Sequence, residues 1–319
     1  MKRRTLLAAA LACSSLPAVL AQDAWPARPV RMVVNFPPGG PLDVLARAVG
    51  DVLQRELKQP FVVDNRAGAG GNIGADAVAK AAPDGHTLLF TIDSTVTVNP
   101  HIYTSMGFRP GDLRPLAILT SSGLLVGTHP SNGFRTLADL VAAGKSRGVT
   151  FSSAGSGSPG HLAAEMATEA TGMKITHVPY KGNAPAVTGI LSGEVTGGVL
   201  ATPGMLPHVK AGKIAALAVT SRKRSALAPD VPTVGEAGLP QLEQEVLYMV
   251  MVPAATPEPV AQAVQKAVAE AANKPEIRSK LESLDMQAEG MTGAAAARRL
   301  AELSERYGRV IRKTGMKVE

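Results

Sequence analysis

Phe36-Pro37-Pro38-Gly39-Gly40-Pro41-Leu42-Asp43 is the stretch that decides the fold. It separates an apolar run at 30–34, typical of a buried strand, from a segment at 42–53 whose apolar residues recur at helical spacing. A Gly-Gly turn that enters a helix leaves several backbone N–H groups without partners beside the positive end of the helix dipole. Such a turn can bind a small anion without an arginine. The two glycines are equally compatible with a plain tight turn.

Strand and helix patterns alternate along the rest of the chain. Strands are predicted at 30–36, 61–63, 87–92, 124–128, 149–153, 175–178, 195–200, 214–220 and 246–252. Helices are predicted at 139–145, 161–171, 184–191, 260–271 and 295–311, the first behind a capping box of Thr136 and Asp139. The alternation indicates an α/β architecture of parallel sheets covered by helices on both faces. Because no flexible linker is evident, we expect the chain to cross between two domains near 116–124 and 215–220.

The first 21 residues have the pattern of an export signal. Lys2, Arg3 and Arg4 precede a short apolar run at 5–12, and Val19-Leu20-Ala21 supplies small residues for cleavage. The run is too short to span a bilayer. Cys13 is the only cysteine, so the processed chain of about 298 residues contains none, which fits a bacterial periplasmic protein with a large core. The general secretory and twin-arginine routes both stay open.

The composition argues against several classes of function. The formal charge of +7 falls to about +4 without the three basic residues of the signal, and no basic run interleaves with aromatics, so we expect no nucleic-acid partner. Aromatic residues make up 3% of the chain, which leaves little surface for stacking a sugar or a nucleobase and favours a small polar ligand. The six histidines form no pair at i, i+4 and have no adjacent cysteine, so no metal and no other cofactor is predicted.

Two further glycine-rich turns follow strand patterns. The turn at 68–74 departs from the dinucleotide fingerprint because Ile73 stands where the third glycine belongs, and no Gly-Lys-Ser/Thr follows for a phosphate loop. The turn at 153–162 carries Ser158 and His161, so a secreted hydrolase must be considered, with Ser158 or Ser153 as the nucleophile. The nucleophile elbow is absent, because Ser156 stands where a glycine should precede Ser158. At this spacing, Ser158 more often caps a helix.

Read together with their flanks, these turns resemble the substrate-binding receptors of tripartite tricarboxylate transporters, the Bug or TctC family. The matching stretches follow one another in order at 25–31, 36–43, 65–74, 83–89, 153–162, 177–182, 210–219 and 232–238. Any one of them is weak, but the ordered set is specific and covers nearly all of residues 25–319.

The resemblance implies a type II periplasmic binding protein, in which two doubly wound α/β domains are joined by two crossover strands with a ligand cleft between them. After the signal at 1–21, domain 1 would comprise 22–122 plus 221–319, and domain 2 would comprise 123–220. The resemblance further implies a monomeric receptor without enzymatic activity, which captures a small organic carboxylate and delivers it to the permease subunits of the transporter. A secreted serine hydrolase and a ligand-presenting sensor subunit for a membrane kinase are the alternatives.

The predicted ligand-binding residues lie on both sides of this cleft. The carboxylate is placed on the backbone around Pro38, Gly39 and Gly40, with Asp43 holding the turn from the first helical turn. The second wall is predicted to consist of Ser153, Gly155, Gly157 and Ser158, with His161 supporting the loop. Further contacts are predicted from Phe36, Ser94, Thr95, Asn99, Tyr180 and Thr202. Ser94, Thr95 and Asn99 could equally form turns, and Lys181 is expected on the surface.

The chain departs from the family at the distal side of the predicted cleft. Thr196 and Leu200 stand where many members carry acids, and both are expected to approach the cleft together with Ala201 and Thr202. The loss of an acid argues against an amino-acid ligand, whose ammonium would need a carboxylate partner. An apolar or aromatic acid is favoured instead. Neither the particular acid nor the permease follows from the sequence.

Overall fold

The computed structural model describes residues 25–318, so the predicted signal at 1–21 lies outside the described residues. The 36–43 turn joins β1 (Val30–Val34) to α1 (Pro41–Leu57), as the sequence predicts. Gly39 has a φ of 80°, a left-handed conformation that glycine adopts without strain. The chain can therefore reverse sharply and begin α1 directly after a buried strand.

The strands form one continuous hydrogen-bonded path. Its order is β2-β1-β3-β9-β4-β7-β5-β6, with β10 and β8 each paired to β4. The further strands are β2 (Phe61–Asn65), β3 (Thr87–Ile92), β4 (Leu113–Thr128), β5 (Val149–Ser153), β6 (Ile175–Pro179), β7 (Gly197–Ala201), β8 (Ala215–Val219), β9 (Glu245–Pro253) and β10 (Gln287–Thr292). Parallel pairing joins β1 to β2 and β3, and β5 to β6 and β7, whereas β4 and β9 run antiparallel to their neighbours.

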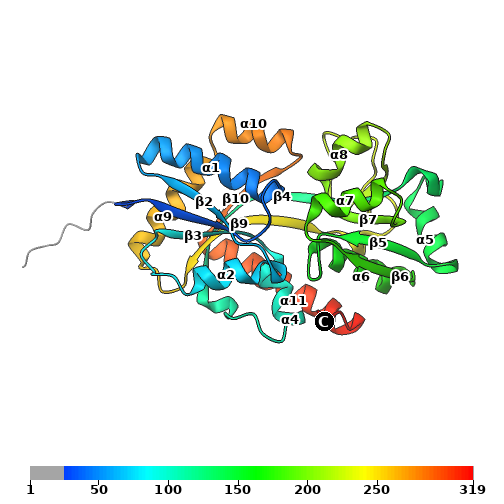
Figure 1. Cartoon of the computed structure of the whole chain (residues 1–319), viewed down its shortest axis with the longest axis horizontal. Helices are drawn as coiled ribbons and strands as arrows, with labels where there is room; N and C mark the ends of the chain where they lie inside the picture. The colour runs from blue at the N-terminus through cyan, green and yellow to red at the C-terminus, as the bar shows by residue number, and fades with distance from the viewer. Residues whose placement is uncertain (1–24, 319) are drawn as a thin grey trace, which may run out of the picture.

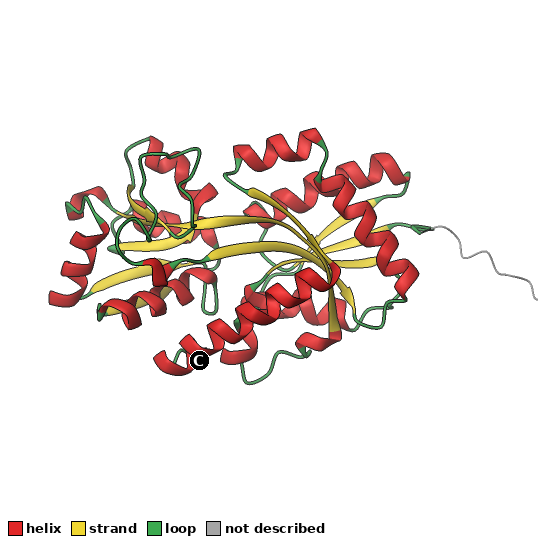
Figure 2. Cartoon of the chain, turned by 180° about the vertical axis from the view of Figure 1, so that it is seen from behind, coloured by secondary structure: helices red, strands yellow, loops and turns green. Residues whose placement is uncertain are grey.

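The path divides into two lobes that share β4. We call the part built on β1, β2, β3 and β9 the first lobe, and the part built on β5, β6, β7 and β8 the second lobe. Within β4, residues from Leu113 to Gly123 pair with β9, and residues from Leu124 to Thr128 pair with β7. Figures 1 and 2 show the long strands β4 and β9 running through the connection between the lobes.

Helices cover both faces of each lobe, as the alternation predicts. In the first lobe, α1 lies above the sheet and α2 and α11 lie below it; in the second lobe, α7 and α8 lie above and α6 lies below (Figure 1). The bounds are α2 (Asn72–Ala79), α3 (Ser94–Thr97), α4 (Asn99–Ile102), α5 (Leu137–Ser146), α6 (Pro159–Thr171), α7 (Asn183–Leu191), α8 (Thr202–Lys210), α9 (Glu258–Ala272), α10 (Pro275–Ser283) and α11 (Gly293–Thr314). Short 3-10 turns lie at Ala69–Gly71, Pro110–Asp112, Pro130–Asn132 and Pro240–Leu242.

The capping box predicted for α5 is confirmed. The Asp139 N–H donates to Thr136 Oγ1 at 3.1 Å, and the Thr136 N–H donates to Asp139 Oδ2 at 2.9 Å. Two backbone donors at the start of the helix are thereby satisfied. Across residues 25–318, none of the helices combines the length with the apolar character that a membrane crossing would require.

The second crossing lies later in the chain than predicted. β8 pairs with β4 inside the second lobe, and segment 221–244 stays there: Val219 bridges Thr233, and Val231 packs in the same core cluster as Leu125. The chain returns to the first lobe only with β9, which begins at Glu245. This packing argues against the expected crossing at 215–220, because those residues pair with the end of β4. The division at 122/123 and 220/221 stays a prediction, and this packing favours a second limit near residue 244.

Candidate functional site

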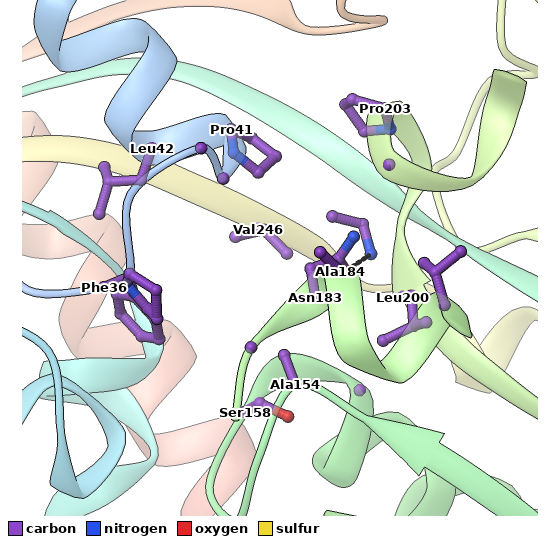
Figure 3. A pocket seen from close by; sticks show the side chains of 18 of the residues that line it. Phe36, Pro41, Leu42, Ala154, Ser158, Asn183, Ala184, Leu200, Pro203 and Val246 are labelled. Carbon is purple, nitrogen blue, oxygen red and sulfur yellow. Dashed lines mark hydrogen bonds between the residues drawn. The ribbon is translucent and has the colours of Figure 1, made fainter. Parts of the chain in front are cut away.

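A cleft of about 550 Å³ lies between the two lobes (Figure 3). Its first wall is the turn at 36–42 with Val44. Its second wall comes from the turns at 154–160 and 181–185 and from helix residues that follow them. The lining residues from the second wall and α8 are Ala154, Ser158, Pro159, Gly160, Lys181, Gly182, Asn183, Ala184, Pro185, Val187, Thr188, Leu191, Pro203, Gly204 and His208. The strands contribute Ile92, Leu124, Val199, Leu200, Ala201, Val246 and Tyr248, and Leu284 completes the lining.

Four helices begin at this cleft. Residues of the first turn of α1, α6, α7 and α8 line it, and each of these helices follows the carboxyl end of a strand, namely β1, β5, β6 and β7. The first turn of a helix presents unpaired N–H groups and a partial positive charge. Helix N-termini that converge from both lobes therefore make the cleft favourable for an anion.

The first-lobe turn is held from behind by Asp43. This buried carboxylate accepts hydrogen bonds from the Gly39 N–H at 3.0 Å, from Arg47 Nε at 3.0 Å and from Asn65 Nδ2 at 2.9 Å. Burial acts to raise the pKa of Asp43, but the hydrogen bonds from Arg47, Gly39 and Asn65 outweigh it and hold the pKa below its ordinary value. Since the Gly39 N–H is occupied, the Gly40 N–H and the first-turn amides of α1 are the donors left for a ligand.

The second-lobe turn is held by Ser158 and His161. The Oγ of Ser158 caps α6 by accepting from the His161 N–H at 3.4 Å, and the Gly157 N–H donates to His161 Nδ1 at 3.2 Å. This bond fixes the neutral tautomer with the proton on Nε2, which faces Glu165 Oε1 at 3.7 Å. The side chain of His161 supports the loop, as predicted, and does not line the cleft.

A second imidazole lies against the first. The rings of His161 and His177 stack with centroids 3.8 Å apart and planes 7° apart. His177 Nε2 lies 2.6 Å from Ser153 Oγ, which also accepts from the Gly155 N–H at 3.2 Å. Burial and the neighbouring His161 lower the pKa of His177 to about 4, with Glu165 opposing them. The neutral stack thus braces the backbone turn behind the cleft wall.

These contacts argue against the hydrolase alternative. Ser153 lies close to a histidine, but its side chain is fully buried and outside the cleft lining. Ser158 does line the cleft, but its Oγ bonds the backbone of His161, and Nδ1 of that histidine is occupied by Gly157. Within residues 25–318, therefore, neither serine is paired with an available base at the cleft. No group of three potential metal-ligating side chains occurs in the same described range.

The predicted site residues separate into two sets. Phe36, Pro38, Gly39, Gly40 and Ser158 line the cleft. The remaining residues do not line it; among them, Asp43, Ser153, Gly155, Gly157 and His161 support the two turns through the contacts given above. Whether any of these residues touches a ligand stays a prediction.

Ser94, Thr95 and Asn99 are not brought to the cleft. All three are buried, and none of them lines the cleft. Thr95 Oγ1 accepts from Asn35 Nδ2 at 3.1 Å, and Asn99 Nδ2 donates to the Gly70 carbonyl at 2.9 Å. Asn99 directly, and Thr95 through Asn35, therefore help to hold the turn at 68–74 in the first lobe.

Tyr180 does not line the cleft as expected, whereas Lys181 is exposed, as expected, and also lines the cleft. The Tyr180 N–H extends the pairing with β5 by donating to the Ser153 carbonyl at 3.0 Å, and the phenol packs against α7 at Gly189. Lys181 lies in the bend between β6 and α7.

Of the distal residues, Leu200 and Ala201 line the cleft as expected. Thr196 does not, because it pairs with Thr150, whose Oγ1 accepts from the Thr196 N–H at 2.9 Å. Thr202 is buried and donates through Oγ1 to the Gly123 carbonyl at 2.8 Å, which ties the start of α8 to β4 where the lobes meet.

Several lining residues were missed by the sequence reasoning. Asn183 and Ala184 begin α7 after a strand and a glycine, the same signal that led to the turn at 36–43. The floor residues Leu124 and Val246 carried no such signal, because nothing distinguishes them from the other residues of buried strands.

Comparison with known proteins agrees with this arrangement. The family model described as "Tripartite tricarboxylate transporter family receptor" matches residues 45–316. Protein BugT of Bordetella pertussis is 36% identical over 318 residues, which is 97% of this chain and 96% of the relative.

Among solved structures, Rpa4515 of R. palustris with adipate superposes with a TM-score of 0.87 at 32% identity, covering 92% of this chain and 99% of that one. MatC from Rhodopseudomonas palustris with bound malate superposes with a TM-score of 0.84 at 28% identity, covering 90% of this chain and 100% of that one. The chain belongs to the tripartite tricarboxylate transporter receptor family, and its fold is that of a periplasmic binding protein.

Proposed function

We propose that this protein is a periplasmic receptor that captures a small organic carboxylate between its lobes and delivers it to the permease subunits of a tripartite transporter. The observation that carries the proposal is the convergence of four helix N-termini on one cleft. The similarity to receptors whose structures contain adipate and malate supports a carboxylate as the anion. Relatives of this kind are receptors and not enzymes, and we extend that role to this chain.

The carboxylate would be held by hydrogen-bond donors from both lobes, most of them backbone amides. On the first lobe these are the Gly40 N–H and the first-turn amides of α1. On the second lobe they are the hydroxyl of Ser158, the amide of Asn183 and the first turns of α6, α7 and α8. A ligand that touches both walls stabilises the closed arrangement over an open one, so binding shifts the balance between the two. The walls already approach each other at the mouth, where a Cβ built on Gly182 would lie 3.6 Å from Pro37 Cγ.

Gly40 offers the sharpest test of this placement. Its φ of −78° and ψ of 167° suit any residue, and a built Cβ meets only the Pro37 carbonyl oxygen, at 3.7 Å. A valine there should leave the fold intact, and its side chain would cover the amides. We expect Gly40→Val to weaken binding roughly 10- to 100-fold, the cost of losing one or two charge-assisted hydrogen bonds. Gly111→Val, at an exposed position with open space around it, is the matched control.

The assay begins with native mass spectrometry of the purified protein, which identifies any acid that is retained. A thermal-shift screen of organic acids and calorimetric titration of the best one follow. A bound acid should stabilise the wild type by about 2.7 kcal/mol at a hundredfold excess over its Kd. Unchanged affinity in Gly40→Val would refute the placement, and a screen in which no carboxylate stabilises the protein would refute the function.

A further inference from the structure

The floor of the cleft is apolar across its whole width. Ile92 and Val246 come from the first lobe, Leu124 and Leu200 come from the strands of the second, and all four side chains are buried (Figure 3 labels Val246 and Leu200). Tyr248 lies beside them, and its hydroxyl is engaged with Ser122 Oγ at 3.2 Å. A polar group of a ligand pressed against this floor would lose water without gaining a partner.

Charged side chains are scarce around the cleft. Among the described residues that line it, Lys181 and His208 are the ones that can carry a charge, and both are positive when ionised. Asp43 lies behind the first wall and is already bonded to Gly39, Arg47 and Asn65. A ligand ammonium would therefore find no carboxylate to neutralise it.

The size of the cleft indicates a bulky ligand. Its volume of about 550 Å³ lies within the range of roughly 300–1,000 Å³ that is usual for sites of drug-sized molecules. A four-carbon hydroxy acid would fill little of this space and would set hydroxyl groups against leucine and valine. Two aromatic side chains, Phe36 and Tyr248, also line the cleft and suit contact with a ring.

We propose that the ligand is a monocarboxylate with an apolar body about the size of a phenyl ring and no amino group. Its carboxylate binds among the helix N-termini, and its body lies over the floor formed by Ile92, Leu124, Leu200 and Val246. This inference rests on the proposed carboxylate-receptor function and narrows the class of acid.

Four acids test the inference by calorimetric titration of the wild-type protein. 3-Phenylpropanoate should bind roughly 30-fold more tightly than propanoate, since burial of the ring is the only difference. It should bind at least roughly tenfold more tightly than L-phenylalanine, which differs only by the α-ammonium. It should also bind more tightly than malate, which has no apolar body.

Val246→Thr probes the floor directly, because it replaces a methyl group by a hydroxyl of similar size. We expect affinity for 3-phenylpropanoate to fall about three- to tenfold while that for propanoate changes less than about twofold. Val252→Thr is the matched control: it lies on the same strand β9, is equally buried and is outside the cleft, so it should leave both affinities unchanged. Melting temperatures of both variants monitor the fold.

The outcomes separate this inference from the function on which it rests. Binding of malate or phenylalanine as tight as that of 3-phenylpropanoate overturns the inference and leaves a carboxylate receptor. Equal affinities for propanoate and 3-phenylpropanoate would also overturn the inference while leaving a carboxylate receptor. If none of the organic acids in the wider screen binds, both the inference and the proposed function fail.

Discussion

Asp93 is a buried acid whose replacement should change the pH dependence of stability. It lies at the end of β3, and its Oδ1 accepts from the Leu247 N–H at 3.0 Å, next to Tyr248 of the cleft floor. Burial raises the pKa of Asp93 to about 7, although hydrogen bonds from Leu247 and Thr97 and the charge of Arg299 oppose the rise. The folded protein therefore holds a proton on Asp93 at pH values where the unfolded chain, with its ordinary pKa of 3.8, has released it.

The sign and size of the effect follow from these two pKa values. A raised pKa contributes stability that is fully present below pH 3.8 and is lost as the pH rises towards 7. At about 1.36 kcal/mol for each pH unit, the loss amounts to about 4 kcal/mol and is complete above pH 7. Asp93→Asn keeps an oxygen to accept the Leu247 N–H but cannot ionise. The free energy of unfolding of the variant, relative to that of the wild type, should therefore rise by about 4 kcal/mol between pH 4 and pH 7.5. Any destabilisation by the substitution that does not depend on pH leaves this rise unchanged.

Urea unfolding followed by circular dichroism at pH 4, 5, 6, 7 and 8 measures this difference. The difference in unfolding free energy, Asp93→Asn minus wild type, should rise by about 1.4 kcal/mol for each pH unit up to pH 7 and then stay level. Asp112→Asn is the control: hydrogen bonds from Arg109 hold the pKa of this half-exposed acid below its ordinary value of 3.8, so its contribution to stability is lost only below that pH and the difference from wild type should stay level from pH 4 to pH 8. A gap for Asp93→Asn that does not vary with pH would refute the reasoning.

Two further predictions concern the second wall of the cleft. Burial lowers the pKa of His177 to about 4, so its contribution to stability is complete above pH 6.5 and is lost as the pH falls towards 4. His177→Gln should therefore abolish up to about 3 kcal/mol of the loss of unfolding free energy between pH 7 and pH 4, as measured by urea unfolding at both values. If the variant loses as much stability in acid as the wild type, the assignment is contradicted. Lys181→Gln should slow association with an organic anion about two- to fivefold at low salt, as measured by stopped-flow fluorescence or calorimetry. If the association rates of variant and wild type still differ in 0.5 M salt, an electrostatic role for this exposed side chain is contradicted.

The parts of the fold that depend on short-range patterns were predictable. The turn at 36–43 and the capping box at Thr136 are encoded by neighbouring residues, and both are present in the structure. β10 was missed because Gln287–Thr292 is mostly exposed and has no apolar run to mark it. The second crossing was hard to place because β8 has the apolar pattern of a core strand, and that pattern does not tell which part of β4 it will pair with.

Polar residues in the interior were hard to assign from the sequence for a related reason. Ser94, Thr95 and Asn99 are residue types that usually mark exposed turns. Here all three are buried; Thr95 bonds Asn35 and Asn99 bonds the carbonyl of Gly70, partners that are distant in sequence. Hydrogen bonds between residues distant in sequence depend on the assembled backbone, so residue type alone could not separate these residues from ligand contacts.

This contrast explains why the charge of the ligand is easier to infer from the sequence than its shape. The donors at the cleft are backbone amides, and a glycine or proline at a strand–helix junction fixes their conformation locally. The floor, in contrast, is assembled from Ile92, Leu124, Leu200 and Val246, which meet only because β3, β9, β4 and β7 adopt one order and register. Shifting the register of one strand by a residue would turn a different set of side chains into the cleft. Receptors that share these glycine-rich turns can therefore bind carboxylic acids whose non-carboxylate parts differ. Selectivity among such acids must be sought in the floor residues.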